Sequence, residues 1–282
     1  MSYELKARMA LTKYGFHFTH SLGQNFLLDE NIIGAIADAA GIHEGDNVLE
    51  IGAGAGVLTA ELAERKTNVC ALEIDRALEP VLTEVLSAYD NVRMVFDDAM
   101  KCDLNALCSA AFGTTSFQVV ANLPYYITAD IMLRLLTSEL NISSITVMVQ
   151  KEAGERMMAH VGQKQYCALA AIIAYHAQSS AVFDVPRKAF TPPPHVDSTL
   201  LRLEIYKEKP VQATDDTRMQ KLINTAFAMR RKTLANNLSA AYGISKEQCM
   251  QLIESCGLDT RVRGEALNLE QLALVEKALS ER

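Results

Sequence analysis

The sequence lacks the features that would place it in several specialised classes of protein. Its longest apolar run, from Cys167 to Tyr175, is far too short to cross a bilayer, and its N-terminal stretch carries charges throughout, with no apolar signal-peptide core. The six cysteines form no C-x-x-C pair and have no zinc spacing, so reduced structural thiols are the best interpretation. We therefore expect a cytoplasmic protein that has no membrane segment and binds no metal.

A surplus of positive charge is also missing. With 27 Lys and Arg against 34 Asp and Glu, the net charge is −7, which argues against a protein that coats nucleic acid indiscriminately. The charge is uneven, because residues 206–282 hold 12 Lys and Arg against 10 Asp and Glu, while residues 1–205 hold 15 against 24. A local basic surface on the C-terminal part is therefore one interpretation of this unevenness.

Internal repeats are absent, and 282 residues fit one large domain and a small one. From Asn47 onward, short β-branched runs alternate with helical patterns, and the predicted strands cover residues 47–51, 69–75, 92–96, 117–121 and 143–149. This alternation predicts an α/β fold with an open, mostly parallel sheet covered by helices on both faces. Two further stretches, SSAVFDV and STLLRLEI, have no helix between them and predict an antiparallel pair that closes one edge of the sheet.

The strand signals stop after Glu204. The segment YKEKPVQATDDT is typical of a linker, and everything after it is predicted to be helical. RMQKLINTAFAMRRKTLANNLSAAYG has apolar residues at helical spacing, and Gly243 is a stop signal. We therefore divide the chain into an α/β domain, residues 1–205 with an N-terminal extension over 1–45, and a small helical domain, residues 206–282.

A glycine-rich turn, EIGAGAG (residues 50–56), lies where the first predicted strand meets the first helix. Glycines let the backbone approach a ligand closely and aim N–H groups at it. Glu73 ends the second strand about twenty residues on, where a carboxylate can accept both ribose hydroxyls. The dinucleotide pattern G-x-G-x-x-G is not kept, because Val57 holds the place of the third glycine. The turn therefore favours S-adenosylmethionine over NAD. Asp98, which follows the third strand, is a candidate acceptor for the adenine amine or an ordinary exposed Asp.

The segment Asn122-Leu123-Pro124-Tyr125 follows the fourth strand, at the same edge of the sheet. An exocyclic amine is a poor nucleophile, because the lone pair of its planar nitrogen is delocalised into the ring. The Asn122 side-chain oxygen and the Leu123 carbonyl would each accept one N–H, turn the lone pair toward a sulfonium methyl and stabilise the developing positive charge. Pro124 would fix the turn, and Tyr125 would offer a flat face to a flipped-out base.

At these residues the sequence resembles the ribosomal RNA adenine N6,N6-dimethyltransferases, and most closely the small-subunit enzymes. The similarity covers nearly the whole chain and rests on separate motifs: SLGQNFL, EIGAGAGVLT, LEID, FDDA, VANLPYYIT, MVQKEAGERM, VPRKAFTPPPHVDSTLLRL and FAMRRKTLANNL. It implies a Rossmann-like class I methyltransferase domain that binds S-adenosylmethionine, without a metal, followed by a helical C-terminal domain. The cofactor contacts that it implies, together with the glycine turn, are Asn25, Leu27, Gly52, Gly54, Glu73, Asp98 and Asn122.

The resemblance also implies a substrate. Two neighbouring adenines near the 3′ end of small-subunit rRNA would receive four methyl groups in total, within a pre-ribosomal particle and with a checkpoint role in ribosome biogenesis. Phe190 would be a second aromatic wall beside Tyr125, unless it is an ordinary core residue. Arg230, Arg231 and Lys232 are our candidates for phosphate contacts, and a solvated helix end is an almost equally good explanation of them. We expect a monomer.

The sequence departs from this family pattern at two places. Thr19 and His20 stand where many relatives carry basic residues, which predicts fewer phosphate contacts there, and Ala53 replaces a common proline of the glycine turn.

Three alternatives stay open. A large-subunit enzyme of the antibiotic-resistance type is disfavoured by the helical tail and the acidic charge. A methyltransferase of protein glutamine is disfavoured by Leu123, where such enzymes have proline. A non-catalytic RNA-binding assembly factor is disfavoured by the intact set of Gly52, Glu73, Asp98 and Asn122.

Overall fold

The computed structural model describes residues 2–19 and 22–281, which fall into two compact units. The first unit comprises the chain up to Gly154 and Ser179–Ile205, and the second comprises Glu155–Gln178 and the chain from Tyr206 onward. The predicted division after residue 205 differs from this in one segment. Residues 155–178, which we assigned to the first domain, group with the C-terminal helices, because the apolar helix α8 (Ala168–His176) packs against α9 and α12 of that unit.

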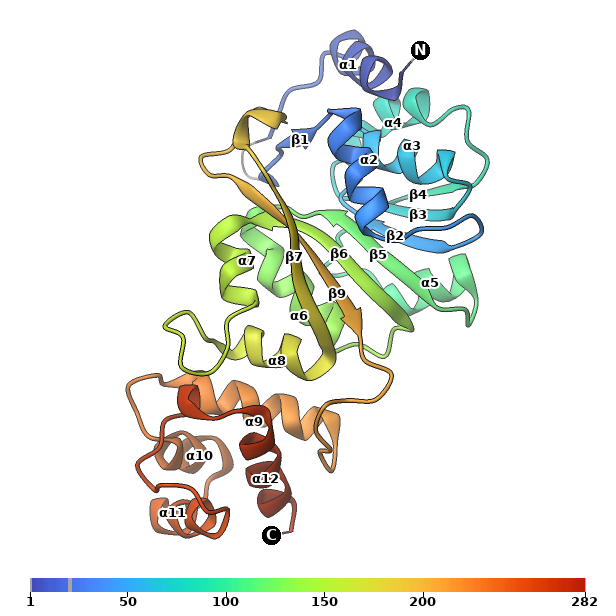
Figure 1. Ribbon diagram of the computed structural model, residues 1–282. Helices are drawn as coiled ribbons and strands as arrows, with labels where there is room; N and C mark the ends of the chain where they lie inside the picture. The colour runs from blue at the N-terminus through green and yellow to red at the C-terminus, as the bar shows by residue number, and fades with distance from the viewer. Residues whose placement is uncertain (1, 20–21, 282) are drawn as a thin grey trace. The chain divides into compact units, whose positions relative to one another are not determined.

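Seven strands form one sheet in the order β4-β3-β2-β5-β6-β9-β7 (Figure 1). Their bounds are β2 Asn47–Ile51, β3 Asn68–Glu73, β4 Val92–Phe96, β5 Phe117–Asn122, β6 Ile142–Gln150, β7 Ala177–Val185 and β9 Ser198–Ile205. Strands β2 to β6 are paired in parallel, and β9 runs antiparallel to β6. The predicted mostly parallel sheet, with the last two strands at one edge, is confirmed.

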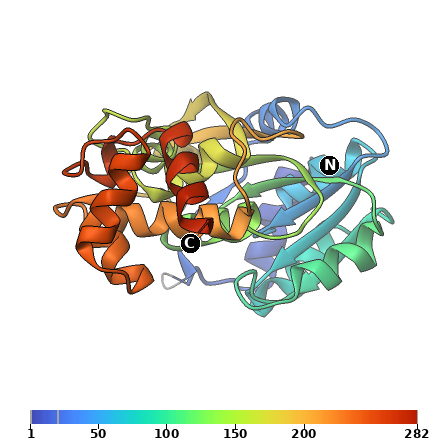
Figure 2. The ribbon, with the colours of Figure 1, turned by 90° about the horizontal axis from the view of Figure 1, so that it is seen from below.

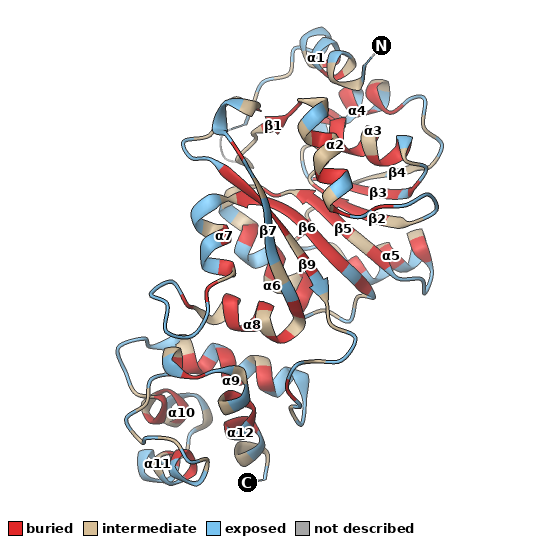
Figure 3. Ribbon diagram, viewed as in Figure 1, coloured by how far each residue is buried: buried red, intermediate tan, exposed pale blue. Residues whose placement is uncertain are grey.

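Helices cover both faces of this sheet. Successive residues are buried along β2, β3, β5 and β6 (Figure 3), which requires packing on the two faces to which alternate side chains point. One apolar cluster joins a face of the sheet to α1–α4. The helices of this unit are α1 Tyr3–Lys13, α2 Glu30–Ala39, α3 Val57–Glu64, α4 Glu79–Val85, α5 Leu104–Phe112 and α6 Thr128–Leu136, and α7 (Lys151–Met157) follows β6 directly.

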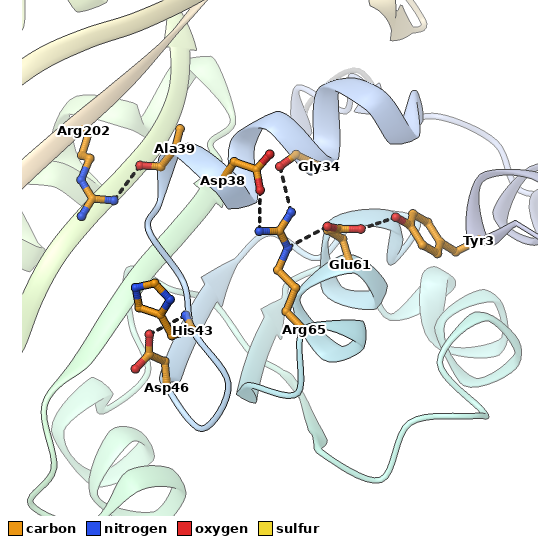
Figure 4. A network of polar contacts seen from close by, with 9 residues as sticks. All are labelled: Tyr3, Gly34, Asp38, Ala39, His43, Asp46, Glu61, Arg65 and Arg202. Carbon is orange, nitrogen blue, oxygen red and sulfur yellow. Dashed lines mark hydrogen bonds and ion pairs between the residues drawn. The ribbon is translucent and has the colours of Figure 1, made fainter.

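A polar network ties α1 and α2 to α3 (Figure 4). The Tyr3 hydroxyl donates to Glu61 on α3, and burial together with this carboxylate raises the pKa of Tyr3. Arg65 donates to the same Glu61 carboxylate at 2.8 Å, to Asp38 at 2.7 Å and to the Gly34 carbonyl at 3.2 Å. The charged arginine thereby occupies acceptors of two helices at once, which fixes the N-terminal extension against the sheet domain.

A short strand pair anchors this extension to the segment between β7 and β9. Strand β1 (Phe26–Leu27) pairs antiparallel with β8 (Phe190–Thr191), which lies in the segment between β7 and β9. Both residues of β1 are buried, so the extension is anchored by apolar side chains on one side and leaves residues 22–25 in an irregular path beside the strand ends.

The second unit is helical, as predicted. Helices α9 Asp216–Ala228, α10 Leu234–Tyr242, α11 Lys246–Ser255 and α12 Leu269–Ser280 pack on one another, and Figure 2 shows them in orange to red. Gly243 caps α10 in the left-handed conformation at φ 68°, so the predicted stop is confirmed. The predicted continuous stretch is broken at residues 229–233, however, because the backbone angles of Met229 and Thr233 lie outside the helical region.

Among residues 2–19 and 22–281, no helix has both the length and the apolar character needed to span a bilayer.

Candidate active site

A cavity opens at the carboxyl ends of β2, β3 and β5, the edge where ligands bind in open parallel sheets. Four segments form most of its lining: residues 22–27 of the N-terminal extension, residues 52–55 after β2, residues 73–74 at the end of β3, and residues 122–125 at the end of β5. Of the residues predicted for the cofactor, this cavity brings together Asn25, Leu27, Gly52, Gly54, Glu73 and Asn122. Asp98, after β4, is not among its lining residues.

The glycine turn has an unusual backbone, but its N–H groups are used differently from our expectation. Gly52, Gly54 and Gly56 all have positive φ values, 83°, 55° and 78°, which explains the glycines. The N–H groups of Gly52 and Ala53 donate to the Leu72 carbonyl, and that of Gly56 donates to Ala53. The expectation that these groups point at a ligand is therefore wrong, because the turn folds back onto β3. Space also matters, since a Cβ on Gly54 would meet the Phe26 ring at 3.2 Å.

Glu73 is held rigidly at the end of β3. One carboxylate oxygen accepts from the Gly54 N–H and the other from the Asp75 N–H, each at 2.8 Å. The side chain is buried, with an exposed fraction of 6%, and burial is the main effect that raises its pKa. Each carboxylate oxygen has a second lone pair, so Glu73 can still accept hydroxyl groups from a ligand in the cavity.

Glu50 is a second buried carboxyl at the cavity. Its exposed fraction is 1%, and neither oxygen makes a hydrogen bond of normal geometry with another described residue. Desolvation raises its pKa to about 8 and outweighs the opposing effect of the Thr59 hydroxyl of α3, which faces the carboxyl. A buried carboxyl without a partner is costly unless a cation or donor reaches it. Together with the buried carboxylate of Glu73, this fits a cavity for a cationic nucleoside such as S-adenosylmethionine.

The Asn122 side chain is oriented by the N-terminal extension. Its Nδ2 donates to the Asn25 carbonyl at 3.2 Å, which leaves Oδ1 as the atom able to accept from a substrate amine. Leu123 is buried, and its N–H donates to the Met148 carbonyl of β6 at 3.3 Å. Pro124 precedes a short 3-10 turn over Tyr125–Ile127 and accepts at its carbonyl from Ile127 and the Thr128 hydroxyl.

The Tyr125 ring lines the cavity, and its hydroxyl lies 2.7 Å from that of Ser198 on β9. This contact fixes the ring at its far end, so the face that borders the cavity has one defined orientation. Burial raises the pKa of Tyr125. The arrangement can hold a planar base beside Asn122.

Three predicted residues or groups are not among the residues that line this cavity: Phe190, Asp98 and the basic group of residues 230–232. Phe190 is part of the hydrophobic core, with an exposed fraction of 3%, and its position in β8 opposite Leu27 is that of a structural residue. The Asp98 carboxylate accepts from the Met100 N–H at 2.8 Å and pairs with Lys101 at 3.0 Å, and these two donors lower its pKa. Their predicted roles stay predictions.

The basic group lies in the second unit, in the turn after α9, where all three side chains are exposed. Arg230 pairs with Glu265 at 3.0 Å and donates to the Lys164 carbonyl, so part of its hydrogen-bonding capacity is used within the protein. Of the two residues that replace the usual basic pair, Thr19 is exposed and His20 lies outside the described residues.

Sequence reasoning assigned no role to four groups that the structure places at or beside the site: Glu50, the Gln24 side chain, Asp75 and Ser198. Gln24 lies inside the motif SLGQNFL and Asp75 inside LEID, so both were within the recognised segments, but only their contacts indicate a role. In the described part of the chain, no three His, Cys, Asp or Glu side chains are grouped as metal ligands would be.

Known proteins resemble this chain over almost its entire length. A small-subunit ribosomal RNA methyltransferase A from Geobacillus thermodenitrificans is 43% identical over 278 residues, covering 97% of this chain and 95% of the relative. The enzyme of the same name from Staphylococcus aureus strain JH9 is 43% identical over 272 residues, covering 95% of this chain and 92% of the relative. That from Alkaliphilus oremlandii is 38% identical over 278 residues, covering 98% of this chain and 97% of the relative.

Solved structures agree with this result. A dimethyladenosine transferase from Plasmodium falciparum superimposes with a TM-score of 0.74 at 25% identity, over 90% of this chain and 96% of its own. The 23S rRNA methyltransferase ErmE superimposes with a TM-score of 0.67 at 25% identity, over 91% of this chain and 100% of its own. The family described as ribosomal RNA adenine dimethylase matches residues 15–280. The chain therefore belongs to the ribosomal RNA adenine dimethylase family and is an rRNA methyltransferase.

Proposed function

We propose that this enzyme transfers methyl groups from S-adenosylmethionine to the N6 amines of two adjacent adenines near the 3′ end of small-subunit rRNA, two methyl groups to each. The observation that carries the proposal is that Glu73 and Asn122 border one cavity, so a ribose acceptor and an amine acceptor face a shared space at the strand ends. The relatives at 38–43% identity, which are named for the small subunit, support this choice of rRNA.

The cofactor supplies a methyl group on a positively charged sulfur. Glu73 would accept its ribose hydroxyls, and Glu50 would face its positive charge as a buried counter-ion. Residues 22–27 would form one wall of the cavity, with the Phe26 ring beside Gly54, and exclude water from it. These contacts would fix the methyl group relative to Asn122, which gives the orientation that a direct transfer requires.

The catalytic turn would hold the target base. Tyr125, fixed by Ser198, would stack on the flipped adenine, while Asn122 Oδ1 and the Leu123 carbonyl would accept the two N–H groups of its amine. The lone pair would then point at the methyl group, and both acceptors would stabilise the positive charge on nitrogen in the transition state. No base is needed before the attack, because the proton leaves only after the nitrogen has become cationic.

The second transfer to the same amine has one N–H less. Asn122 and Leu123 cannot then both accept, so one of the two acceptors must tolerate an unfilled position. The side chain of Asn122 is held by a single 3.2 Å hydrogen bond from Nδ2, whereas Leu123 is buried and its backbone is bonded to β6. We therefore assign the remaining N–H to the rigid Leu123 carbonyl and the adjustment to Asn122.

The choice between subunits rests on the relatives and not on the fold. The two solved structures, one a dimethyladenosine transferase and the other a 23S rRNA methyltransferase, have the same 25% identity to this chain. In our proposal the substrate is rRNA within a pre-ribosomal small-subunit particle, the enzyme acts as a cytoplasmic monomer, and the methylation has a role in ribosome biogenesis. Arg231 and Lys232, exposed in the turn after α9, would contact phosphates, with Arg230 contributing less because Glu265 holds it.

The test is methyl transfer to four acceptors: immature small subunits, large subunits, naked rRNA and protein extract. With a labelled donor, we expect label only in small-subunit rRNA, as dimethylated adenine at two adjacent positions. Label confined to large-subunit rRNA or to protein would overturn the proposed substrate. Tight binding to the small-subunit particle without any label would instead favour the non-catalytic assembly factor.

A further inference from the structure

The side chain of Gln24 joins two parts of the chain that are far apart in sequence. Its Nε2 donates to Asp75 Oδ2 at 2.6 Å, and its Oε1 accepts from the Thr19 N–H at 2.6 Å. Both ends of the amide are therefore used, and they can be used in only one orientation, because the amide nitrogen must face the carboxylate.

Asp75 is itself fixed to the cofactor side of the cavity. Its N–H donates to Glu73 Oε1 at 2.8 Å, and its Oδ1 accepts from the Ala77 N–H at 2.9 Å. It therefore stands two residues beyond Glu73 with one oxygen used locally, and the other oxygen is the one that binds Gln24.

The residue next to Gln24 orients Asn122. The Asn25 carbonyl accepts from Asn122 Nδ2 at 3.2 Å, and Asn25 Nδ2 in turn donates to the Gly23 carbonyl at 3.0 Å. Residues 22–25 have no sheet pairing of their own, since the antiparallel pair with β8 begins at Phe26. The Gln24 amide is thus the side-chain anchor of the stretch whose backbone contacts Asn122.

We propose that Gln24 is a positioning residue, which by its bond to Asp75 holds the Asn25 carbonyl against the Asn122 amide and so couples the cofactor side of the cavity to the catalytic turn. The inference rests on the proposed function and extends it. Without the anchor, residues 22–25 would gain conformational freedom, the wall of the cavity would loosen, and Asn122 would lose the acceptor that sets its orientation.

The hydrogen-bond pattern allows a test by exchange of donor and acceptor. In Gln24→Glu, two carboxylates face each other. In Asp75→Asn, the side-chain oxygen still accepts from the Ala77 N–H, so the new amide nitrogen faces that of Gln24. In the double variant Gln24→Glu/Asp75→Asn, the new amide nitrogen at position 75 can donate to the new carboxylate at position 24, whose other oxygen still accepts from Thr19. Each single change should therefore damage the enzyme, and the two together should restore it.

Gln118 provides a matched control. Its Nε2 donates to Asp46 Oδ2 at 3.1 Å and its Oε1 accepts from the Ser144 hydroxyl at 3.1 Å, so Gln118→Glu creates the same facing carboxylates. This pair lies at the opposite end of the strands, where β5 begins, and it does not line the cavity. A loss that comes only from a weakened fold would appear in both glutamine variants.

Three quantities are to be measured in all variants: the dissociation constant of S-adenosylmethionine, the turnover number, and the hydrogen exchange of backbone amides 22–28 in the free protein. For Gln24→Glu and Asp75→Asn at pH 8 we expect at least a tenfold loss of affinity and of turnover, with faster exchange over residues 22–28. The double variant should recover to within about threefold of the wild type. Gln118→Glu should keep its affinity and its exchange over residues 22–28 within about twofold.

Wild-type exchange and affinity in Gln24→Glu, or no recovery in the double variant, would overturn the inference, as would equal losses in Gln118→Glu. A wild-type protein that methylates no RNA would overturn the proposed function alone, because exchange and cofactor affinity would still report on Gln24.

Discussion

The two halves of the site are built in different ways. The cofactor half is fixed by residues at adjacent strand ends: Glu73 accepts from the N–H groups of Asp75 and of Gly54, 19 residues earlier, through hydrogen bonds at 2.8 Å. The catalytic half depends on a distant segment, since Asn122 is oriented by Asn25, which lies 97 residues earlier in the chain. The comparison teaches that each half has residues that fix it, and that the bond between Gln24 and Asp75 is the link that we propose between the two halves.

The largest effect is expected for Asn122→Ala. Loss of one preorganised acceptor of the developing charge should reduce turnover at least about a hundredfold. Because Glu73 and the glycine turn are anchored without Asn122, the dissociation constant of S-adenosylmethionine should change by less than about threefold. Single-turnover methylation and equilibrium cofactor binding measure the two effects separately. If Asn122→Ala loses turnover and cofactor affinity in parallel, Asn122 itself supports cofactor binding as well as catalysis.

Glu73→Gln tests the other half. The substitution keeps the size of the side chain but replaces one oxygen by a donor, which would face the N–H of Gly54 or Asp75 and disrupt the glycine turn. We expect cofactor affinity to fall about ten- to a hundredfold, with turnover at saturating cofactor reduced by less than tenfold. A calorimetric titration gives the affinity. If saturating cofactor does not restore turnover, Glu73 also acts in the catalytic step.

The sequence predicts the positions of the glycine turn and of Glu73, because both stand at the ends of strands that periodicity locates. Strands β2 and β4 have the predicted bounds, and Glu73 ends β3 as expected, so the parallel order alone brings them to one edge. The use of the N–H groups in the glycine turn was not predictable in this way. It depends on how closely the turn folds onto Leu72 of the adjacent strand.

The catalytic half was predicted as a motif but not as a structure. Nothing in the spacing of Asn25 and Asn122 indicates that one orients the other, or that Ser198 fixes Tyr125. The break between α9 and α10 was not evident from the apolar spacing either. The backbone of Met229 leaves the helical region, and Thr233 begins α10 as its N-cap.

Glu50→Gln tests whether the ionised, buried Glu50 carboxyl destabilises the free protein and whether bound cofactor reduces this destabilisation. Burial raises the pKa of Glu50 to about 8, so the fold favours the protonated carboxyl. The contribution of protonated Glu50 to the stability of the fold is therefore fully present below the unfolded-state pKa, near 4.5. It is lost as the pH rises through the folded-state pKa of about 8. Relative to Glu50→Gln, which does not titrate, the wild type should lose about 2–4 kcal/mol of stability between pH 5 and pH 9.

The measurement is the difference in melting temperature between Glu50→Gln and the wild type, recorded from pH 5 to pH 9 without cofactor. The melting temperature of Glu50→Gln should rise relative to that of the wild type as the pH rises. Saturating S-adenosylmethionine should shrink this gain, because a positive charge at the carboxylate stabilises its ionised form. Parallel melting curves over the whole range would show that Glu50 does not titrate as a buried acid in the folded protein.

The smallest effect is expected for Tyr125→Phe, which tests how rigid the catalytic half must be. The substitution keeps the stacking face and removes the hydroxyl that contacts Ser198 at 2.7 Å. Stacking should persist, so we expect turnover on rRNA to fall only about two- to fivefold, with cofactor affinity unchanged. Tyr126→Phe is the matched control, since that ring is 54% exposed and is not among the residues that line the cavity. If turnover falls as much in Tyr125→Phe as in Asn122→Ala, the Tyr125 hydroxyl takes part in the reaction. The catalytic half then depends on Ser198 as strongly as on Asn25.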